Sequence, residues 1–285
     1  MRRTFADVLK SGHIDIKNEY EKLYGIMFED NIEDGYDESY SLHDLIAENF
    51  SNYSISGTCL TLEEFDQKYG FIFEENPEDF DIDYLVSFCE YIQNLLICFR
   101  TDPLNMLGST TQHVDAGRIM EHIEKVMDSI GYMQTYDDAF LIYVEKSPAA
   151  IAVSESPIIP ENLSYRVFEY NHHSLRGDID KKKQILIAIA ALLEAKRDDL
   201  KAANSALCSD VFYAFNNLNL RHNNIDSSIP AKYKLTVANM SNEKLEEWYD
   251  EVFQMCLLAI LEIENNARKQ RFKTLKDSIE NNIIV

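Results

Sequence analysis

Apolar residues return at helical spacing along most of this chain. Over residues 84–96 and 119–127 they recur every three or four positions, which is typical of amphipathic helices. The C-terminal half has three more such stripes, preceded by a shorter helical segment, over residues 161–173, 178–200, 207–218 and 245–263. Four consecutive segments of this kind predict a four-helix-type bundle.

Polar and helix-breaking residues indicate where these helices begin and end. Pro103 is expected to end the helix over 84–96, because proline cannot continue a helical hydrogen-bond ladder. Asp178 or Asp180 can cap the start of the helix that follows, and Ser241 or Asn242 can cap the last one. The predicted C-terminal helices therefore have defined ends.

The periodicity changes in the middle of the chain. Met133–Thr135, Phe140–Glu145 and Ala150–Ser154 are short runs rich in β-branched or aromatic residues, separated by polar or proline-containing turns. These runs predict a small antiparallel hairpin or a three-stranded meander.

Pro157 and Pro160 follow these runs and favour a link between two domains near residue 158. We therefore expect an acidic helical domain over 1–157, ending in the small hairpin or meander, and a helical bundle over 158–285. The predicted fold class is mainly α, with a helical N-terminal region and a four-helix-type bundle at the C-terminus.

Charge is distributed unevenly along the chain. The 285 residues carry 27 Lys and Arg against 49 Asp and Glu, a net charge of −22. Residues 26–90 contain 18 acidic residues and one basic residue, Lys68, so they carry −17 and the rest of the chain about −5. Such a charge disfavours general coating of DNA or of an anionic membrane, and it favours a basic protein partner for residues 26–90. The interspersed aromatic residues indicate short folded helices and not a disordered acidic tail.

Several classes of site have no counterpart in the sequence. The chain has only 9 Gly, and it has neither a phosphate-binding glycine loop nor a dinucleotide fingerprint. Its five cysteines form no Cys-x-x-Cys pair, so no metal and no cofactor are expected. The first ten residues lack the apolar core of a signal peptide, and no run of 18 apolar residues occurs. We therefore expect a cytoplasmic protein that does not bind membranes.

An asparagine-rich run at residues 216–224 is the most unusual local composition. If a helix continued through it, Asn217, Arg221 and Asn224 would share one face, and His222 would lie on the apolar stripe. One interpretation is a phosphate or RNA site, where Arg221 and His222 are catalytic and the two asparagines bind substrate. The other is a helix C-terminal cap, in which asparagines satisfy exposed carbonyls and the basic residues oppose the helix dipole.

A second candidate segment covers residues 165–178. Arg166 and His172 are separated by five residues and form a second-rank pair for the same chemistry. The adjacent His172 and His173 point about 100° apart on a helix, so they are poorly placed to share a metal. The basic run Lys181–Lys183 is expected to be a solvated face.

The run LNLRHNN at 218–224, the segment GDIDKKKQILIAIAALLE beginning at Gly177 and LEEWYDEVF at 245–253 resemble bacterial proteins associated with abortive infection. Those proteins are often grouped with the HEPN superfamily, and the resemblance covers about residues 160–265. It implies a helical bundle that dimerises and, in active members, cleaves RNA without metal through Arg and His separated by four to six residues. Here Arg221 and His222 are adjacent, whereas Arg166 and His172 have that spacing.

Three functional hypotheses follow, and the first is the leading one. In the first, the chain belongs to a bacterial anti-phage defence system, and its HEPN-like bundle binds RNA or cleaves it as a metal-independent endoribonuclease, acting as a homodimer. In the second, the chain is a non-enzymatic interaction or regulatory protein whose acidic region docks a basic partner. The third is a structural subunit without further activity, in which the asparagine cluster is a helix cap. The sequence leaves open whether the chain is an enzyme.

Overall fold

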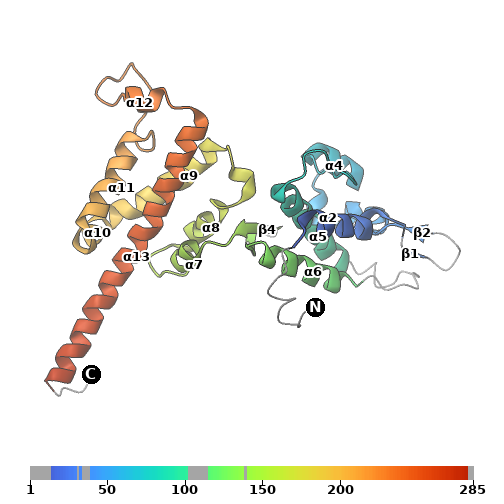
Figure 1. Cartoon of the computed structure of the whole chain (residues 1–285), viewed down its shortest axis with the longest axis horizontal. Helices are drawn as coiled ribbons and strands as arrows, with labels where there is room; N and C mark the ends of the chain where they lie inside the picture. Colours follow the sequence, from blue (N-terminus) through green and yellow to red (C-terminus); the bar gives the residue numbers. More distant parts are fainter. Residues whose placement is uncertain (1–13, 31, 34–38, 102–114, 138–139, 282–285) are drawn as a thin grey trace, which may run out of the picture. The chain divides into compact units, whose positions relative to one another are not determined.

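The computed structural model describes residues 14–30, 32–33, 39–101, 115–137 and 140–281. They form a mainly α-helical chain that divides into two compact units, Met1–Tyr143 and Val144–Val285 (Figure 1). The expected fold class is therefore confirmed. Pro103, the expected end of one helix, lies outside the described residues.

The N-terminal unit combines short helices with two small β ladders. Its helices and 3-10 turns are α2 (Ile16–Phe28), α3 (Leu42–Glu48), η1 (Phe50–Asn52), η2 (Ser54–Ser56), α4 (Leu62–Tyr69), α5 (Ile82–Thr101) and α6 (Ala116–Ser129). Strands β1 (Ile32–Glu33) and β2 (Ser39–Tyr40) pair antiparallel, and β3 (Tyr132–Asp137) pairs with β4 (Phe140–Glu145). The predicted hairpin in the middle of the chain is thus present.

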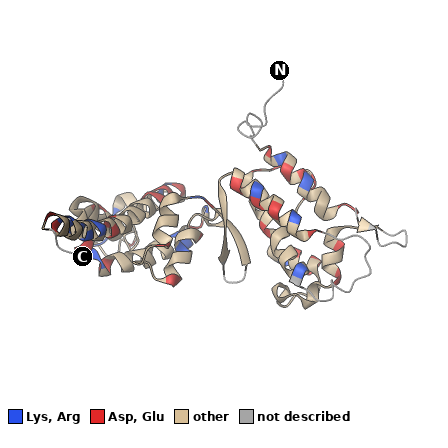
Figure 2. Cartoon of the chain, turned by 90° about the horizontal axis from the view of Figure 1, so that it is seen from below, with Lys and Arg blue, Asp and Glu red and all other residues tan. Residues whose placement is uncertain are grey.

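Aromatic rings fill the interior of this unit. The fully buried Tyr20 lies 4.9 Å from the ring of Phe88 and 5.4 Å from that of Tyr84, measured between centroids. Acidic residues such as Glu63 and Glu75 are exposed on the same unit. Figure 2 shows acidic positions, coloured red, along its helices. The aromatic residues of the acidic segment therefore build a core, and its carboxylates face solvent.

Helix α5 combines 20 residues of length with a largely apolar composition. Its window Ile82–Arg100 is long and apolar enough to cross a membrane by length and composition alone. Half of that window is buried inside the structure, where it packs against α2 and α6.

After the end of strand β4, the regular elements described in the C-terminal unit are helices joined by loops. They are α7 (Pro148–Ser154), α8 (Glu161–Glu169), η3 (His173–Leu175), α9 (Ile179–Ala195), α10 (Arg197–Ala203), α11 (Ser205–Asn217), α12 (Leu235–Ala238) and α13 (Asn242–Glu280). Helix α13 packs against α7, α9, α10 and α11, and its Phe253, Cys256 and Ile260 are fully buried. The expected caps are also confirmed, because Asp178 accepts from the Lys181 N–H and Ser241 from the Lys244 N–H.

The structure differs from the expected elements at Ala150–Ser154, which is helical and not a strand. Ser147 caps this helix by accepting a hydrogen bond from the Ala150 N–H at 3.2 Å, and Pro148 occupies its first position. These two features favour a helix start over the β propensity of the residues that follow. Because α7 packs against α8 and α13, the division between units falls after Tyr143, 14 residues before the end of the expected first domain.

Candidate functional site

The asparagine-rich run does not continue helix α11, so its polar side chains do not share the expected helical face. Helix α11 ends at Asn217, and Asn219 adopts a left-handed backbone conformation with φ of 57°. Asparagine tolerates this conformation better than most residues, and it turns the chain into a loop. Residues 218–224 are therefore loop residues.

Asn224 lies inside this loop. Its side chain is fully buried, its amide nitrogen donates to the carbonyls of Asn216 at 3.1 Å and Lys232 at 2.7 Å, and its amide oxygen accepts from the Asn219 N–H at 2.8 Å. In return, the Asn224 N–H donates to the side-chain oxygen of Asn219 at 3.3 Å. The capping interpretation predicts hydrogen bonds of this kind. They bind the side-chain amide of Asn224 to other groups of the protein.

Arg221 and His222 point toward different neighbours. The Arg221 guanidinium forms an ion pair with Glu194 and lies 5.4 Å from the ring centroid of Phe212. His222 lies beside Lys232, with 3.3 Å between the imidazole Nε2 and the ammonium nitrogen. The side chains of Arg221 and His222, which were proposed to be catalytic, therefore contact different neighbours.

The second candidate segment, by contrast, forms much of a polar pocket of about 450 Å³ in the C-terminal unit. Tyr170 and Asn171 follow the end of helix α8, His172 is the N-cap of η3, and Arg176 follows η3. The pocket is lined by Glu145, Tyr170, Asn171, His172, Arg176, Lys182, Glu246, Asp250, Phe253 and Gln254. Arg166 is exposed in the last turn of α8 and is not part of this lining, so the pocket includes His172 without its expected partner.

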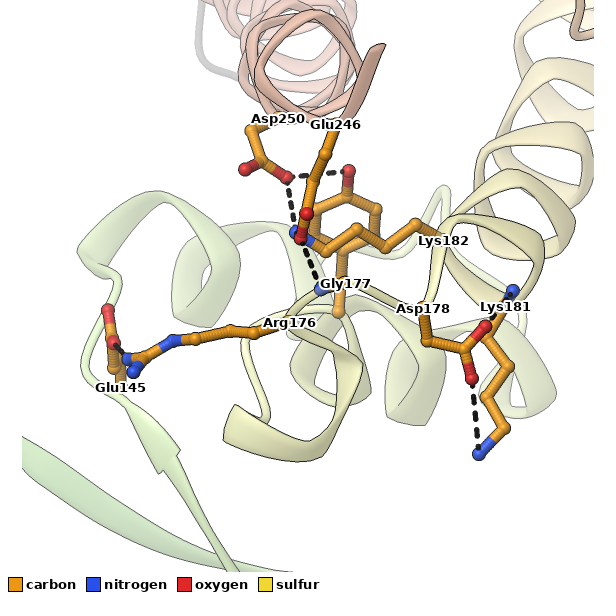
Figure 3. Close-up of polar contacts among 9 residues, drawn as sticks. Glu145, Arg176, Gly177, Asp178, Lys181, Lys182, Glu246 and Asp250 are labelled. Carbon is orange, nitrogen blue, oxygen red and sulfur yellow. Dashed lines mark hydrogen bonds and ion pairs between the residues drawn. The ribbon is translucent and has the colours of Figure 1, made fainter. Parts of the chain in front are cut away.

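Lys182 lies at the centre of the pocket, between helices α9 and α13 (Figure 3). Only 5% of the residue is exposed, and its ammonium group contacts Glu246 at 2.7 Å and Asp250 at 2.8 Å. The Gly177 N–H donates a second hydrogen bond to Glu246 at 2.8 Å. The ion pairs therefore connect the start of α9 to α13, and the expectation that Lys181–Lys183 is solvated is wrong for Lys182.

The charged form of Glu246 is stabilised by its neighbours. Burial raises the pKa of Glu246, but the hydrogen bonds from Lys182 and Gly177 outweigh it and hold that pKa below its ordinary value. Tyr170 donates its hydroxyl to Asp250 at 3.0 Å and stacks on Phe253 with 3.9 Å between ring centroids. Burial, followed by the negative charge of Asp250, raises the pKa of Tyr170, so its hydroxyl stays protonated.

Arg176 and His172 complete the polar rim. Arg176 forms an ion pair with Glu145, and both side chains are half-exposed. The Ser174 N–H donates to the Nδ1 atom of His172 at 3.2 Å, and the Ser174 hydroxyl lies 2.7 Å from the same nitrogen.

The balance of charge decides what this pocket can bind. Three carboxylates face two permanent cations, Arg176 and Lys182, and both cations are already paired. A phosphate would find no uncompensated positive charge, whereas a cationic group would find an excess of carboxylate oxygens. The Asn171 side-chain nitrogen is buried without a hydrogen-bond partner in the described structure, which leaves one donor for a carbonyl oxygen.

A metal ion finds less support within either unit. Among the described residues, no group of three His, Cys, Asp or Glu with converging ligand atoms lies wholly within one unit. The pocket is therefore suited to a small organic cation, such as a lysine or arginine side chain with its own carbonyl.

One feature of the sequence indicates this pocket, although no short motif does. Lys182 is four residues before Leu186 and three before Ile185, so it lies on the apolar stripe of its helix. A lysine at such a position requires a buried counter-charge. Glu246 and Asp250, four residues apart on one face of α13, supply it.

Comparison of this chain with protein-family models, with curated proteins and with solved structures found no match. The family suggested by the short sequence motifs therefore stays a prediction.

Proposed function

We propose that this protein is a non-enzymatic interaction protein that binds a basic protein partner through its acidic N-terminal region. The observation that carries the proposal is the charge of residues 26–90, which have 18 acidic residues and one lysine. The aromatic interior explains why the described residues of this segment fold despite that charge. A folded surface of one sign attracts partners of the opposite sign and accelerates their association.

The acidic loop between α4 and α5 is the best-defined part of this surface. Glu75, Glu78 and Asp79 are exposed, and none of them takes part in a hydrogen bond or ion pair that the structure describes. Their carboxylates are not needed for the fold of the unit. They are therefore well suited to meet lysine and arginine side chains of a partner.

The pocket around Lys182 gives independent support. Its excess of carboxylates and the unpaired Asn171 nitrogen suit a basic side chain and its backbone carbonyl. Both units thus offer acceptors for positive charge, and no described pocket offers uncompensated positive charge for an anion.

The proposal predicts a salt-sensitive complex. The full chain, purified from its native host at about 50 mM salt, should bring down a basic protein, and most of it should be released at about 500 mM salt because exposed charges are then screened. The measurement is the amount of each protein and nucleic acid that is recovered across a salt series. Recovery that does not change with salt, or recovery of nucleic acid alone, would contradict the proposal.

An RNA-directed function of the C-terminal unit is the second candidate, in the anti-phage setting that the sequence motifs imply. One observation favours it: the loop after α11 contains Arg221, Lys232 and Lys234 with Asp226 as its acidic residue, in an otherwise acidic protein. Such a loop can contact phosphates. The ion pair between Arg221 and Glu194 weakens this candidate, because it already neutralises the arginine.

The two candidates differ in their predictions for RNA cleavage. We expect the purified protein to leave RNA intact in metal-free buffer, and we expect the variants Arg221→Ala/His222→Ala and Arg166→Ala/His172→Ala to behave in the same way. The measurement is a time course of cleavage of a labelled RNA. Cleavage by the natural protein that either double variant abolishes would overturn the non-enzymatic proposal and assign the active site to that pair.

A further inference from the structure

The C-terminal part of helix α13 is an arm without a partner. Figure 1 shows the last turns of this helix extending beyond the other helices of its unit. In the arm, defined as residues 264–280, Phe272, Leu275 and Ile279 form an apolar stripe at steps of three and four and are 57%, 41% and 66% exposed. Residues 268–276 add five basic residues and no acidic one. An exposed stripe of this kind in an amphipathic helix indicates a docking face.

The same unit contains an apolar groove of about 460 Å³ between α11, α12 and α13. Its lining is mostly apolar and includes Leu218, Val237, Met240, Val252 and Met255. Two large aromatic residues at the groove are strongly exposed, with Tyr213 at 70% and Trp248 at 43%. Asn217, one of the residues predicted to bind substrate, also lines this groove.

The charges around the groove oppose those of the arm. Asp210 and Glu251 line the groove itself, and an adjoining hollow that shares Trp248 and Glu251 adds Glu247 and Asp250. Lys234 and Lys244 are the basic residues of these two sites. The whole arm carries five basic and three acidic residues, and one of the acidic residues, Glu264, pairs with Arg268. The arm is therefore positive where the groove region is negative.

The arm of one molecule cannot reach its own groove. Both belong to one continuous helix, with Val252 in the groove and Phe272 in the arm. Twenty residues of α-helix separate these positions by roughly 30 Å along the helix axis. An occupant with the chemistry of the arm must therefore come from another molecule.

We propose that the arm of one copy of this chain docks in the groove of a second copy. The stripe of Phe272, Leu275 and Ile279 covers the apolar lining between Tyr213 and Trp248, and the basic residues of the arm pair with the carboxylates beside it. Because each chain has one arm and one groove, two copies can exchange arms in a symmetric dimer that leaves neither feature exposed. This inference goes beyond the proposed function, since it concerns self-association of the C-terminal unit and not the basic partner.

The test is the oligomeric state of the full chain, measured by sedimentation over a range of concentrations. The natural protein should dimerise. The variant Phe272→Glu/Ile279→Glu should raise the dimer dissociation constant by at least about 100-fold, because buried apolar anchors dominate such contacts. The matched control Gln270→Glu/Thr274→Glu adds the same charge on the opposite face of the exposed arm and should dimerise like the natural protein.

The groove is tested separately. Tyr213→Glu should also weaken the dimer, whereas Ile187→Glu, a half-exposed position of α9 outside the groove, should not. Trp248 is the single tryptophan of the chain, so its fluorescence reports on the groove directly. Its emission should shift to shorter wavelength as the natural protein dimerises, and this shift should be absent in the arm variant.

A photo-crosslinker at position 279 identifies the occupant. It should trap residues near 213–218 or 248–255 of a second copy. A monomeric natural protein, an association that nuclease treatment removes, or crosslinks to residues 26–90 would each overturn the proposal. Loss of the dimer in the arm variant but not in Tyr213→Glu would overturn it as well, because it would show that two arms pair with each other.

Discussion

Replacing Lys182 with methionine should lower the free energy of unfolding of the C-terminal unit by about 3 kcal/mol, because it leaves two carboxylates without their buried counter-charge. Methionine approximates the length of the lysine chain, so the expected loss comes from charge and not from a cavity. Glu246 is the more buried partner, with 19% of its side chain exposed, whereas Asp250 is 49% exposed and keeps part of its hydration. The expected loss of stability is therefore at the lower end of the range of about 3–5 kcal/mol that follows removal of one partner from a buried ion pair.

Trp248 makes this measurement specific, because the single tryptophan lies in the C-terminal unit. Denaturant unfolding followed by its fluorescence reports that unit apart from the acidic one. Lys181→Met is the matched control: the Lys181 side chain is 58% exposed and its contact with Asp178 is 3.8 Å long, so we expect a change within about 0.5 kcal/mol. Equal stability of both variants would show that the buried ion pairs do not hold α9 against α13.

The effect should also depend on pH. The folded pKa of Glu246 is lowered, so its contribution to stability is present above its unfolded pKa of about 4.3 and is lost as the pH falls through the folded value. In Lys182→Met, burial raises that pKa instead, and protonation in acid relieves the unpaired charge. The difference in stability between the natural protein and the variant should therefore narrow as the pH falls, first through the raised pKa of Glu246 in the variant and then through its lowered pKa in the natural protein.

Asn224→Ala should destabilise the same unit by about 2 kcal/mol. The substitution removes the side chain that satisfies the carbonyls of Asn216 and Lys232 and the N–H of Asn219, and unpaired buried groups cost about 1–3 kcal/mol each unless water reaches them. Hydrogen exchange should speed up in the loop over residues 218–234. Asn223→Ala, at an exposed position in the same loop, should change stability by less than about 0.5 kcal/mol.

This pair of variants also decides between the two interpretations of the asparagine-rich run. A stable Asn224→Ala protein with ordinary exchange in the loop would contradict the capping role. This outcome would favour the other interpretation, in which Asn224 binds a ligand.

The sequence predicted the features that depend on local patterns. The apolar spacing identified the segments that form α8, α9 with α10, α11 and α13, and Asp178 and Ser241 cap helices α9 and α13 as expected. Local patterns failed at Ala150–Ser154, where the cap formed by Ser147 outweighs the β propensity of the run. They failed again at Lys196, where the chain breaks one expected helix into α9 and α10.

The candidate site was harder to predict because its residues are far apart in sequence. Tyr170, Lys182 and Asp250 converge only when α8, α9 and α13 pack together. The composition of the asparagine-rich run suggested a site on a helix. The left-handed conformation of Asn219 ends the helical geometry, so residues beyond it do not follow helical spacing. Its residues form an ordered loop, whereas the second-ranked segment supplies the walls of the pocket.

The central claim, that the acidic region binds a basic protein, is tested most directly by the affinity of the partner recovered from the native host. The full chain is compared with Glu75→Gln/Glu78→Gln/Asp79→Asn and with the control Glu155→Gln/Asp180→Asn/Asp198→Asn, which removes the same charge from exposed positions of the C-terminal unit. At about 50 mM salt, we predict that the first variant raises the dissociation constant at least about tenfold, mainly through slower association, and that the control leaves it nearly unchanged. Equal affinities for all three proteins would contradict the claim.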